Sequence, residues 1–373
     1  IRVCRDDDMD MMFVEDCCQI LDSMRVPITA SDREEGEYPY YGANGIQDYV
    51  ADYIFDDELV LLAEDGGNFG SKERPIAYRV SGKCWVNNHA HVLKPKDGLD
   101  VDYLCYSLMF YKVDGMVNGA TRQKLTQAAM RKMQIPSRSM DEQKYIVDEL
   151  NRIIRIKEQR QQELQLLDDL IKARFVELFG FPGTDEKGWG LRPLGECCEI
   201  NPKKVSDKRL ASGMQVSFVP MTAVSENGAI KTAEKKTYDE VKVGFTYFAE
   251  NDVLFAKITP CMENGKGAVA VGLCNGIGFG STEFHVLRPL NGRSNPYWLY
   301  SLISFDTFRK DAAANMTGSA GQRRVPSMFL EKYKITLPPF ELQNQFADFV
   351  HQVDKSKFVL QKTFQIIHYS DII

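Results

Sequence analysis

The feature that most constrains this chain of 373 residues is an internal duplication, because stretches of its first half recur in order in the second. The offset between partners grows from 180 to 194 residues. Insertions in the second copy would produce this growth, so we expect two similar globular modules. The matched pairs are VEDCCQI (14–20) with LGECCEI (194–200), YPYY (38–41) with FVPM (218–221, Pro39 over Pro220), LVLLAE (59–64) with DVLFAK (252–257), VNNHAHVLKP (86–95) with GSTEFHVLRP (280–289), and GATRQK (119–124) with GSAGQRR (318–324).

A run without proline or glycine separates the two copies, from Ser139 to Gly180. Ser139 and Glu142 form a capping-box start, and Gly180 with Pro182 supplies the stop. Side chains recur in this run at a spacing of four and three, which predicts one seam of a coiled coil. Such a helix would extend about 60 Å, too long to be buried in one module. The seam residues are Ile146, Leu150, Ile153, Leu164, Leu167 and Ile171, with Lys157 and Arg160 as polar members.

The C-terminal segment repeats the seam 200 residues later. Two such helices in one chain most simply pair with each other. The predicted fold is therefore α+β, with two tandem similar domains, each followed by a long helix, and the helices pairing as an antiparallel coiled coil. The second seam consists of Phe346, Val350, Val353, Leu360, Phe364 and Ile367, with Lys357 as a polar member.

Each copy mixes short β-like runs with amphipathic helical ones, which favours the α+β class. Helices are expected over 103–111 and 297–308. Strands are expected over 59–63, 76–80, 85–93, 245–248, 253–258, 268–271 and 284–287.

The charge is distributed unevenly along the chain. Residues 1–135 carry 15 basic and 23 acidic residues, a net charge of −8, whereas residues 191–335 carry 19 and 14, a net charge of +5. A polyanionic partner should therefore meet the second module most easily. The nine cysteines include two adjacent pairs and no CxxC, which fits reduced thiols better than a disulfide framework or a zinc site.

Four short motifs suggest catalysis or ligand binding, and each has a more ordinary interpretation. Asn295-Pro296-Tyr297 is one proline short of a methyltransferase loop and is better explained by helix packing. Gly265-Lys266-Gly267 lacks the spacing of a phosphate loop, and Gly276 to Gly280 is better explained as a strand entry. His89-x-His91 with Cys84 could suggest a metal, but core or DNA-facing histidines are favoured because the second copy lacks the other ligands.

The layout and motifs resemble the DNA-specificity subunit of type I restriction–modification systems. YPYYGANGI (38–46), AEDGGNFG (63–70), VNNHAHVL (86–93), FAKITPCMENGKGA (255–268) and GFGSTEFHVLRP (278–289) look like its target-recognition domains. The IP…EQ (135–143) and LPP…Q (337–343) segments look like the starts of its helical spacers. Residues 1–13 look unlike the family, and the second helix is short for it.

The resemblance implies recognition domains at residues 1–135 and 183–336, and spacer helices at 136–182 and 337–373. Each domain would read one half of a split double-stranded DNA site. The helices would set the gap and dock two methyltransferase subunits, which a restriction/translocase subunit joins. The chain itself would be cytoplasmic and non-catalytic and would bind no cofactor or metal, because S-adenosylmethionine, ATP and Mg serve the partner subunits.

Groove reading needs amides, Arg and Lys for base edges, and hydroxyl or basic groups for phosphates. Both copies supply these groups on glycine-rich turns. The alternative interpretation is a solvated surface, with the tyrosines of YPYYGANGI packing inward. The candidates in copy one are Tyr40, Tyr41, Asn44, Asn68, Lys72, Arg74, Asn87, Asn88, His89, Arg122 and Lys124. The candidates in copy two are Lys257, Thr259, Asn264, Lys266, Ser281, Thr282, Gln322, Arg323 and Arg324.

The two copies share strand sequences and diverge at the tips, where Glu64 is replaced by Lys257 and Asn87-Asn88-His89 by Ser281-Thr282-Glu283. This pattern suits two modules that read two different sequences. Three alternatives remain open: the specificity fragment of a fused restriction–methyltransferase enzyme, a silent recombination cassette, and a coiled-coil interaction protein that does not bind DNA.

Overall fold

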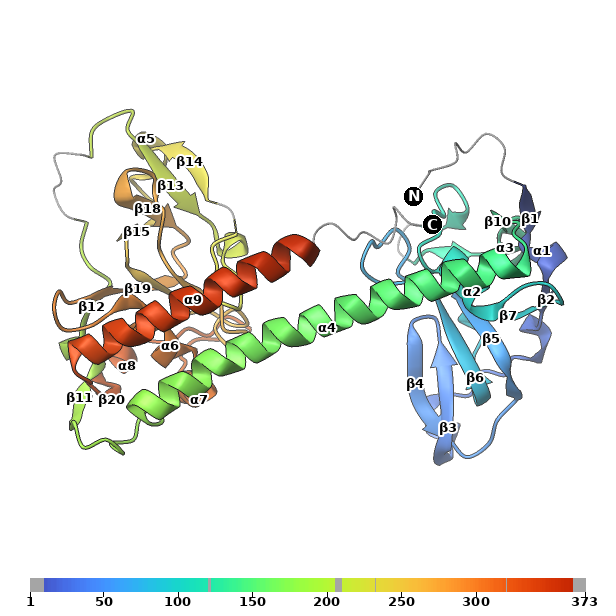
Figure 1. The fold of residues 1–373 in the computed structure, drawn as a ribbon, viewed down its shortest axis with the longest axis horizontal. Helices are drawn as coiled ribbons and strands as arrows, with labels where there is room; N and C mark the ends of the chain where they lie inside the picture. Colours follow the sequence, from blue (N-terminus) through green and yellow to red (C-terminus); the bar gives the residue numbers. More distant parts are fainter. Residues whose placement is uncertain (1–9, 120–121, 205–209, 232, 320, 365–373) are drawn as a thin grey trace. The chain divides into compact units, whose positions relative to one another are not determined.

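A computed structural model describes residues 10–119, 122–204, 210–231, 233–319 and 321–364 (Figure 1). The chain forms two compact units: unit 1 contains residues 1–160 and 363–373, and unit 2 contains residues 161–362. Helix α4 (Met140–Phe179) begins in unit 1 and ends in unit 2. It starts and stops where the sequence predicts, since Ser139 and Glu142 form the capping box and Gly180 has a positive φ of 78°.

Unit 1 is a mixed α+β module whose first and last strands pair with each other, Met11 opposite Pro136. Its strands are β1 (Met11–Phe13), β2 (Cys18–Ile20), β3 (Glu35–Gly42), β4 (Gly45–Val50), β5 (Phe55–Ala63), β6 (Ala77–Val86), β7 (Ala90–Pro95), β8 (Val117–Asn118), β9 (Lys124–Leu125) and β10 (Gln134–Pro136). Its helices before α4 are α1 (Val14–Cys17), η2 (Asp22–Met24), η3 (Ala30–Asp32), α2 (Val101–Met109) and α3 (Gln127–Arg131).

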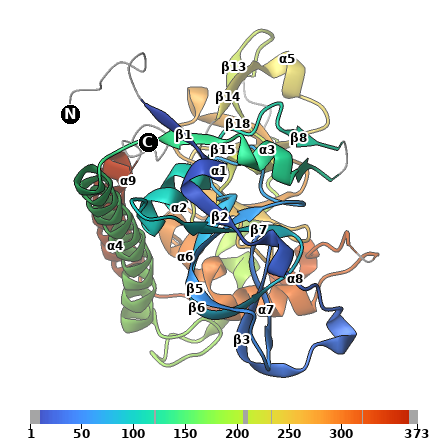
Figure 2. The same ribbon diagram turned by 90° about the vertical axis from the view of Figure 1, so that its right-hand side faces the viewer.

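The main sheet of unit 1 has six strands in the order β2-β7-β5-β6-β3-β4. Strand β5 is buried on both faces, because successive side chains of a strand point to opposite sides. Val60 and Leu62 pack in one core cluster with Leu104 and Leu108 of α2, which covers that face (Figure 2). Leu59 and Leu61 pack in a second cluster on the other face. This double burial explains why the sequence of β5 reads as one apolar run.

Unit 2 repeats this plan, again closed by its first and last strands, Leu191 opposite Thr336. Its strands are β11 (Leu191–Pro193), β12 (Cys198–Ile200), β13 (Gln215–Val219), β14 (Glu234–Thr237), β15 (Thr246–Ala249), β16 (Val253–Ala256), β17 (Gly267–Val269), β18 (Ile277–Gly280), β19 (Phe284–Pro289) and β20 (Lys334–Thr336). Its helices are η4 (Leu194–Glu196), η5 (Met221–Ala223), α5 (Tyr238–Val241), η6 (Cys274–Gly276), α6 (Pro296–Ser304), α7 (Asp306–Ala314), α8 (Ser327–Lys332) and α9 (Phe340–Phe364).

The sheet that is continuous in unit 1 is split in two in unit 2, with orders β12-β19-β16-β17 and β14-β13-β18-β15. Strand β6 pairs with β5 at one end and with β3 at the other. In unit 2 these two pairings belong to separate strands, β17 with β16 and β18 with β13. The segment between β17 and β18 includes η6, which interrupts what would otherwise be one strand.

Strand register confirms the duplication. Ile20 lies opposite Leu93 in unit 1, and Ile200 lies opposite Leu287 in unit 2. One alignment was wrong, however. Tyr41 lies opposite Val86, and Val219 lies opposite Gly280, so Tyr41 corresponds to Val219. Pro39 therefore does not match Pro220. The segments before β3 and β13 differ in length, which hid the shift.

Two predicted elements were single in the sequence and are double in the structure. The run 85–93 is not one strand, because β6 ends at Val86, a turn follows, and β7 begins at Ala90. The predicted helix 297–308 breaks at Phe305, whose extended backbone separates α6 from α7. An apolar run does not reveal a reversal when the turn residues are as short as Asn87-Asn88-His89.

The long helices pack on the globular cores with several of their predicted seam residues. Ile146 packs against the core of unit 1, and Ile171, Phe346 and Val350 belong to or pack on the core of unit 2. Leu150 and Val353 are buried. Residues Ile153, Leu164, Leu167 and Leu360 are half-buried, as are the polar members Lys157 and Arg160. The side chain of Phe364 and the whole of Ile367 lie outside the described part of the chain.

Within unit 2 the end of α4 and the start of α9 are in direct contact. The ring of Phe346 packs edge-on against Phe175 and Phe179, at centroid distances of 5.6 and 5.4 Å. Further along, Lys357 forms an ion pair with Asp168. Because higher numbers on α9 meet lower numbers on α4, the two segments run antiparallel here.

None of the described helices has the length and apolar character needed to cross a membrane. The cysteines of the described residues are free thiols, and those of both adjacent pairs are buried.

Candidate nucleic-acid interface

The same backbone frame brings three segments together in each unit. In unit 1 the amide of Glu64 donates to the carbonyl of His89 (2.8 Å), and the amide of Leu125 donates to the carbonyl of Glu64 (2.7 Å). In unit 2 the amide of Lys257 donates to the carbonyl of Glu283 (2.9 Å), and the amide of Val325 donates to that of Lys257 (2.9 Å). The ends of β5 and β16 and the turns after β6 and β18 therefore meet the segments GATRQK and GSAGQRR.

The frame of unit 1 carries an acidic side chain at its centre. The carboxylate of Glu64 accepts a hydrogen bond from Arg25 (2.6 Å) and forms an ion pair with Lys124 (3.0 Å). Burial opposes ionisation of Glu64, but the hydrogen bonds from Arg25 and Lys124 hold its pKa below the ordinary value. Lys124 remains half-exposed, so its ammonium group is available to solvent or to a phosphate.

A second group of predicted residues lies beside Glu64. Asp65 contacts both His89 Nδ1 (2.7 Å) and the guanidinium of Arg122 (2.6 Å), whose side chain is 61% exposed. The amide of Asn44 donates to the carbonyl of Gly66 (2.9 Å). The turn of YPYYGANGI is thus docked on the loop of AEDGGNFG, and the predicted Asn44, His89, Arg122 and Lys124 form one surface cluster.

The frame of unit 2 carries a basic side chain at its centre. Lys257 occupies the place of Glu64, and Glu283 occupies that of His89. Arg324 forks onto the carboxylate of Glu283 through Nε (2.9 Å) and a terminal nitrogen (2.7 Å). Burial lowers the pKa of Lys257, whereas the hydrogen bond from Arg324 lowers that of Glu283. A carboxylate that grips one edge of a guanidinium leaves its other edge free to donate.

The neighbouring residues of unit 2 extend this surface. The amide of Thr259 donates to the carbonyl of Arg323 (3.1 Å), and its hydroxyl donates to Glu263 (3.0 Å). Arg323 is exposed, and its guanidinium lies 4.0 Å from Glu263. Lysine, threonine and arginine side chains are therefore grouped at one end of the module, as the sequence predicts.

Beneath each frame lies a buried histidine, and the two differ in their partners. His91 Nε2 contacts the carbonyl of Leu125 (2.9 Å), and Nδ1 contacts the carboxylate of Asp22 (2.7 Å). His285 Nε2 contacts the carbonyl of Val325 (2.7 Å), while Nδ1 faces the amide of Asn201 (2.9 Å). Burial lowers the pKa of His285. These contacts confirm the interpretation of His91 as a core residue.

Among the described residues, Asp22, Glu64 and His91 bring potential metal ligands within 4.8 Å of one another. The positive charge there is already supplied by Arg25, which lies 2.6 Å from Glu64 and 3.5 Å from Asp22. Gln127 also donates to Asp22 (2.9 Å). The lone pairs that a metal would need are thus engaged, and the arrangement fits a structural network.

Comparisons with known proteins agree with the duplicated architecture. The model of the family described as type I restriction modification DNA specificity domain matches residues 6–166 and again 186–366. This chain belongs to that family.

Its similarity to curated relatives is local. The specificity subunits of the type I restriction enzymes EcoAI and EcoEI from Escherichia coli are each 42% identical to it, over 160 and 156 residues. These stretches cover 42% and 41% of this chain, and 26% and 25% of the relatives, so the chain matches about a quarter of their length. The type I restriction–modification S subunit from M. genitalium has the same fold, with a TM-score of 0.55, 12% identity, and coverage of 100% of this chain and 96% of that one.

Two predicted contact residues of this family member turn inward, which corrects the sequence prediction. Tyr40 is 1% exposed, and its hydroxyl receives a hydrogen bond from the amide of Ile28 (3.1 Å). Asn87 is 3% exposed, donates to Gln47 (3.0 Å) and accepts from the amide of His89 (2.8 Å). Both side chains hold the turns in place and cannot reach a duplex.

The remaining predicted residues lie at the surface to different degrees. Tyr41 is half-buried against Tyr78. Asn68 donates a long hydrogen bond to the carbonyl of Pro75 (3.4 Å), and Lys266 donates one to that of Met221 (3.4 Å). Ser281 is half-buried and caps its own turn. The fully exposed members are Lys72, Arg74, Asn88, Asn264, Thr282 and Gln322.

Sequence reasoning missed three polar residues that support the frames. Arg25 and Asp22 in unit 1, and Asn201 in unit 2, lie just past the repeats VEDCCQI and LGECCEI. Asp22 and Asn201 make the same contact, accepting from the amides of Val92 (2.9 Å) and Val286 (3.1 Å). A search for polar residues at matched distances beyond each repeat would have found this pair.

The alternative motifs have structural explanations. Asn295 caps α6 by accepting from the amide of Tyr297 (2.9 Å), which confirms the interpretation as helix packing. Gly278 lies in strand β18, where an added Cβ would come within 2.1 Å of the ring of Phe248. Glycine at this position therefore makes room for an aromatic ring.

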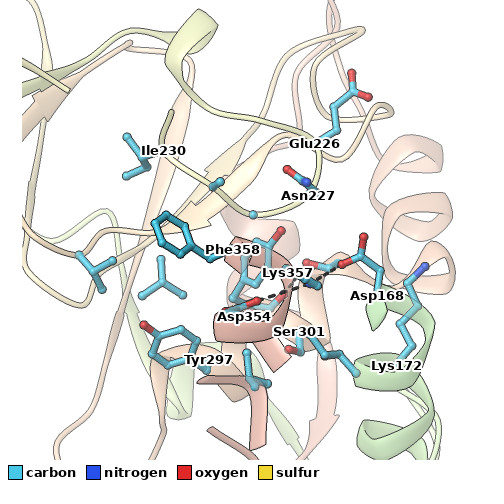
Figure 3. A pocket seen from close by; sticks show the side chains of 18 of the residues that line it. Asp168, Lys172, Glu226, Asn227, Ile230, Tyr297, Ser301, Asp354, Lys357 and Phe358 are labelled. Atoms are coloured by element: carbon cyan, nitrogen blue, oxygen red, sulfur yellow. Dashed lines mark hydrogen bonds and ion pairs between the residues drawn. The ribbon is translucent and has the colours of Figure 1, made fainter. Parts of the chain in front are cut away.

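A cavity of about 600 Å³ in unit 2 lies apart from these predicted contacts (Figure 3). Its lining includes Asp168 of α4, Tyr297 of α6 and Asp354 of α9. Lys357 crosses it and pairs with both Asp168 and Asp354. The cavity thus borders the contact between the two helices.

Proposed function

We propose that this chain is the non-catalytic DNA-recognition subunit of a type I restriction–modification complex. Each unit reads one half of a bipartite site in the DNA grooves. One observation carries the proposal: the two units share a backbone frame residue for residue, yet place Glu64 and Lys257, opposite charges, at the same point of it. A conserved frame with inverted chemistry is what two readers of different sequences need.

The proposed contact set follows from exposure and chemistry. Arg324 presents a guanidinium braced by Glu283, which suits bidentate contact with a guanine edge. Arg122, Lys124 and His89 form the corresponding set in unit 1. The exposed lysines and hydroxyls around them would contact phosphates. Tyr40 and Asn87 are left out because they are buried.

The long helices are proposed to form the antiparallel coiled coil that fixes the gap between half-sites. The contacts of Phe346 with Phe175 and Phe179, and of Lys357 with Asp168, support this pairing inside unit 2. An interhelical ion pair beside an apolar contact is typical of the flank of such a seam.

The partners are proposed from the family: two methyltransferase subunits and a restriction/translocase subunit, which use S-adenosylmethionine, ATP and Mg in a cytoplasmic complex. Residues 1–135 carry 15 basic and 23 acidic residues, a net charge of −8. Such a module gains little from phosphate attraction, so the methyltransferase subunits would supply much of the neutralisation of the DNA.

The test is a methylome. The chain is co-expressed with the methyltransferase encoded beside it in a host without DNA methylation, and modified adenines are mapped by long-read sequencing. Two short half-sites around a fixed gap are expected, and exchanging residues 191–335 for those of another specificity subunit should change one half only. A soluble complex that methylates no site, or a continuous site read by one unit, would overturn the proposal.

A further inference from the structure

We propose that Gln143 and Gln343 are positioning residues that fix the direction in which each long helix leaves its module, and so restrict the gap between half-sites to one length. This inference rests on the proposed function. It assigns a separate task to two amide side chains that touch no proposed DNA-contact residue.

Gln143 lies in the first turn of α4, and its side chain is completely buried. Its Oε1 accepts from the amide of Asp100 (2.8 Å), while its Nε2 donates to the carbonyls of Gly98 and Arg138 (both 2.9 Å). Asp100 is the N-cap of α2, and Arg138 belongs to the segment that leads into α4. One amide thus joins the beginning of the long helix to the beginning of the helix that covers the sheet.

Gln343 repeats this arrangement 200 residues later and is also completely buried. Its Oε1 accepts from the amide of Asn295 (2.8 Å), and its Nε2 donates to the carbonyls of Arg293 (3.1 Å) and Pro338 (2.9 Å). Asn295 is the N-cap of α6, so each partner occupies the same structural position as in unit 1. The two units differ at Glu64 and Lys257 but retain this amide unchanged.

A glutamine is well suited to hold an angle, because its amide offers an acceptor and two donors in one plane. Here all three directions are used, and each points to a different part of the backbone. Rotating the helix would leave buried backbone groups without partners, which is costly. An apolar residue of similar size would fill the space without specifying a direction.

A small change of direction is enough to change the gap. Helix α4 has 40 residues. At about 1.5 Å per residue, a helix of this length is a lever of about 60 Å, so a tilt of about 3° moves its far end by about 3.4 Å. That displacement equals the rise of about one base pair. Recognition of a single gap length therefore requires each helix to be held to within a few degrees at its root.

Additional contacts further along the helices support the same orientation in each unit. The hydroxyl of Tyr106 on α2 donates to Asn151 of α4 (2.6 Å). The ring of Tyr297 on α6 packs against His351 of α9 at 4.3 Å. These contacts lie one to two turns beyond the glutamines and differ between the units. The glutamine is the element that both units share.

The test compares gap preference with half-site preference. Gln143→Met and Gln343→Met remove the polar amide and keep much of the volume; Gln159→Met and Gln352→Met are the controls, because these glutamines are exposed on α4 and α9. Each variant is assembled with the methyltransferase subunits. Methylation is measured on a plasmid library that carries the native half-sites at the native gap and at gaps one and two base pairs shorter or longer.

The expected result is unchanged half-site sequences with relaxed gap selection. Methylation at neighbouring gaps, relative to the native gap, should rise about tenfold, the ratio that corresponds to one lost buried hydrogen bond. The controls should keep the native preference. Where a methionine variant does not form a complex, Gln143→Glu and Gln343→Glu keep the side-chain shape and lose the donors.

Folded variants that retain the native gap preference would overturn this inference alone, as would folded variants that methylate none of the library. A wild-type chain without a split motif would instead overturn the proposed function, and the inference with it. The two failures are therefore distinguishable in one experiment.

Discussion

Unit 1 and unit 2 have the same backbone frame, but one is centred on an acid and the other on a base. In unit 1, Glu64 gathers Arg25 and Lys124 around itself. In unit 2, Lys257 lies beside a Glu283–Arg324 pair. The difference teaches that main-chain hydrogen bonds alone maintain the frame, since the amide and carbonyl of residue 64 or 257 make the same bonds whatever the side chain. The charges are therefore free to vary with the sequence that each unit reads.

The largest expected difference between the units concerns the roots of their helices. Phe346 is completely buried among aromatic rings, whereas its counterpart Ile146 is half-buried. Phe346→Ala should destabilise unit 2 by about 3–5 kcal/mol, as for other buried phenylalanines, and Ile146→Ala should destabilise unit 1 by about 2 kcal/mol or less. Hydrogen exchange of amides in β19 and β7 measures the two units separately. Equal losses would break this comparison.

The next difference concerns the proposed base contacts. Arg324→Ala should lower the methylation rate of the native site by about 10- to 100-fold, because a bidentate base contact contributes about 1–3 kcal/mol. Lys124→Ala, which removes a half-exposed point charge, should lower it by less than about tenfold. Lys310→Ala, at an exposed position on α7, is the control. If Arg324→Ala methylates all related sites as well as the wild type does, Arg324 reads no base.

The buried histidines should make the units respond differently to acid. Burial holds the pKa of His285 below its unfolded value, so the unfolded state binds more protons as pH falls below about 6.5. The stability of unit 2 is therefore present above that pH and should fall by up to about 1.4 kcal/mol per pH unit below it.

Asn201→Asp should reduce this loss, since it places at His285 the carboxylate that Asp22 places at His91. Hydrogen exchange of β19 between pH 7 and pH 5 measures the effect. Amides of β19 that show the same pH dependence in the wild type and in Asn201→Asp would contradict this account.

The smallest expected effect concerns the exposed loop of unit 1. Lys72→Ala should weaken DNA binding by the assembled complex equally for all sequences and reduce the salt slope by about 1. The chain without its partners should bind DNA weakly and with a shallow slope, because unit 1 is acidic. Titrations at several salt concentrations test both statements, and tight sequence-specific binding by the chain alone at about 0.15 M salt would refute the second.

The sequence predicts the duplicated frame well, because strand register follows the repeat. The offsets of LVLLAE and VNNHAHVLKP gave the correct pairing of β5 and β7 with their counterparts β16 and β19. It failed at YPYY, where the preceding segments differ in length and a proline offered a false match. Alignment of short aromatic stretches has little to fix it when insertions lie on both sides.

The candidate site was predicted in part. Asn44, His89, Arg122 and Lys124 do lie together, but Tyr40 and Asn87 point inward. Adjacent strand residues face opposite sides, and a sequence of amides and tyrosines on a glycine turn does not say which side is solvent. Gln143 and Gln343 carry no pattern beyond their matched positions, so only their hydrogen bonds reveal that they act as fixed joints.

The interruption between β17 and β18 has a practical consequence. Pairings on both sides of it match those of the single strand β6, so the added segment is tolerated without disturbing either sheet. Evolution has in effect carried out an insertion experiment at this point. The equivalent position in β6, near Gly82 with its positive φ of 75°, is where an engineer should first place a fluorescent or affinity tag in unit 1.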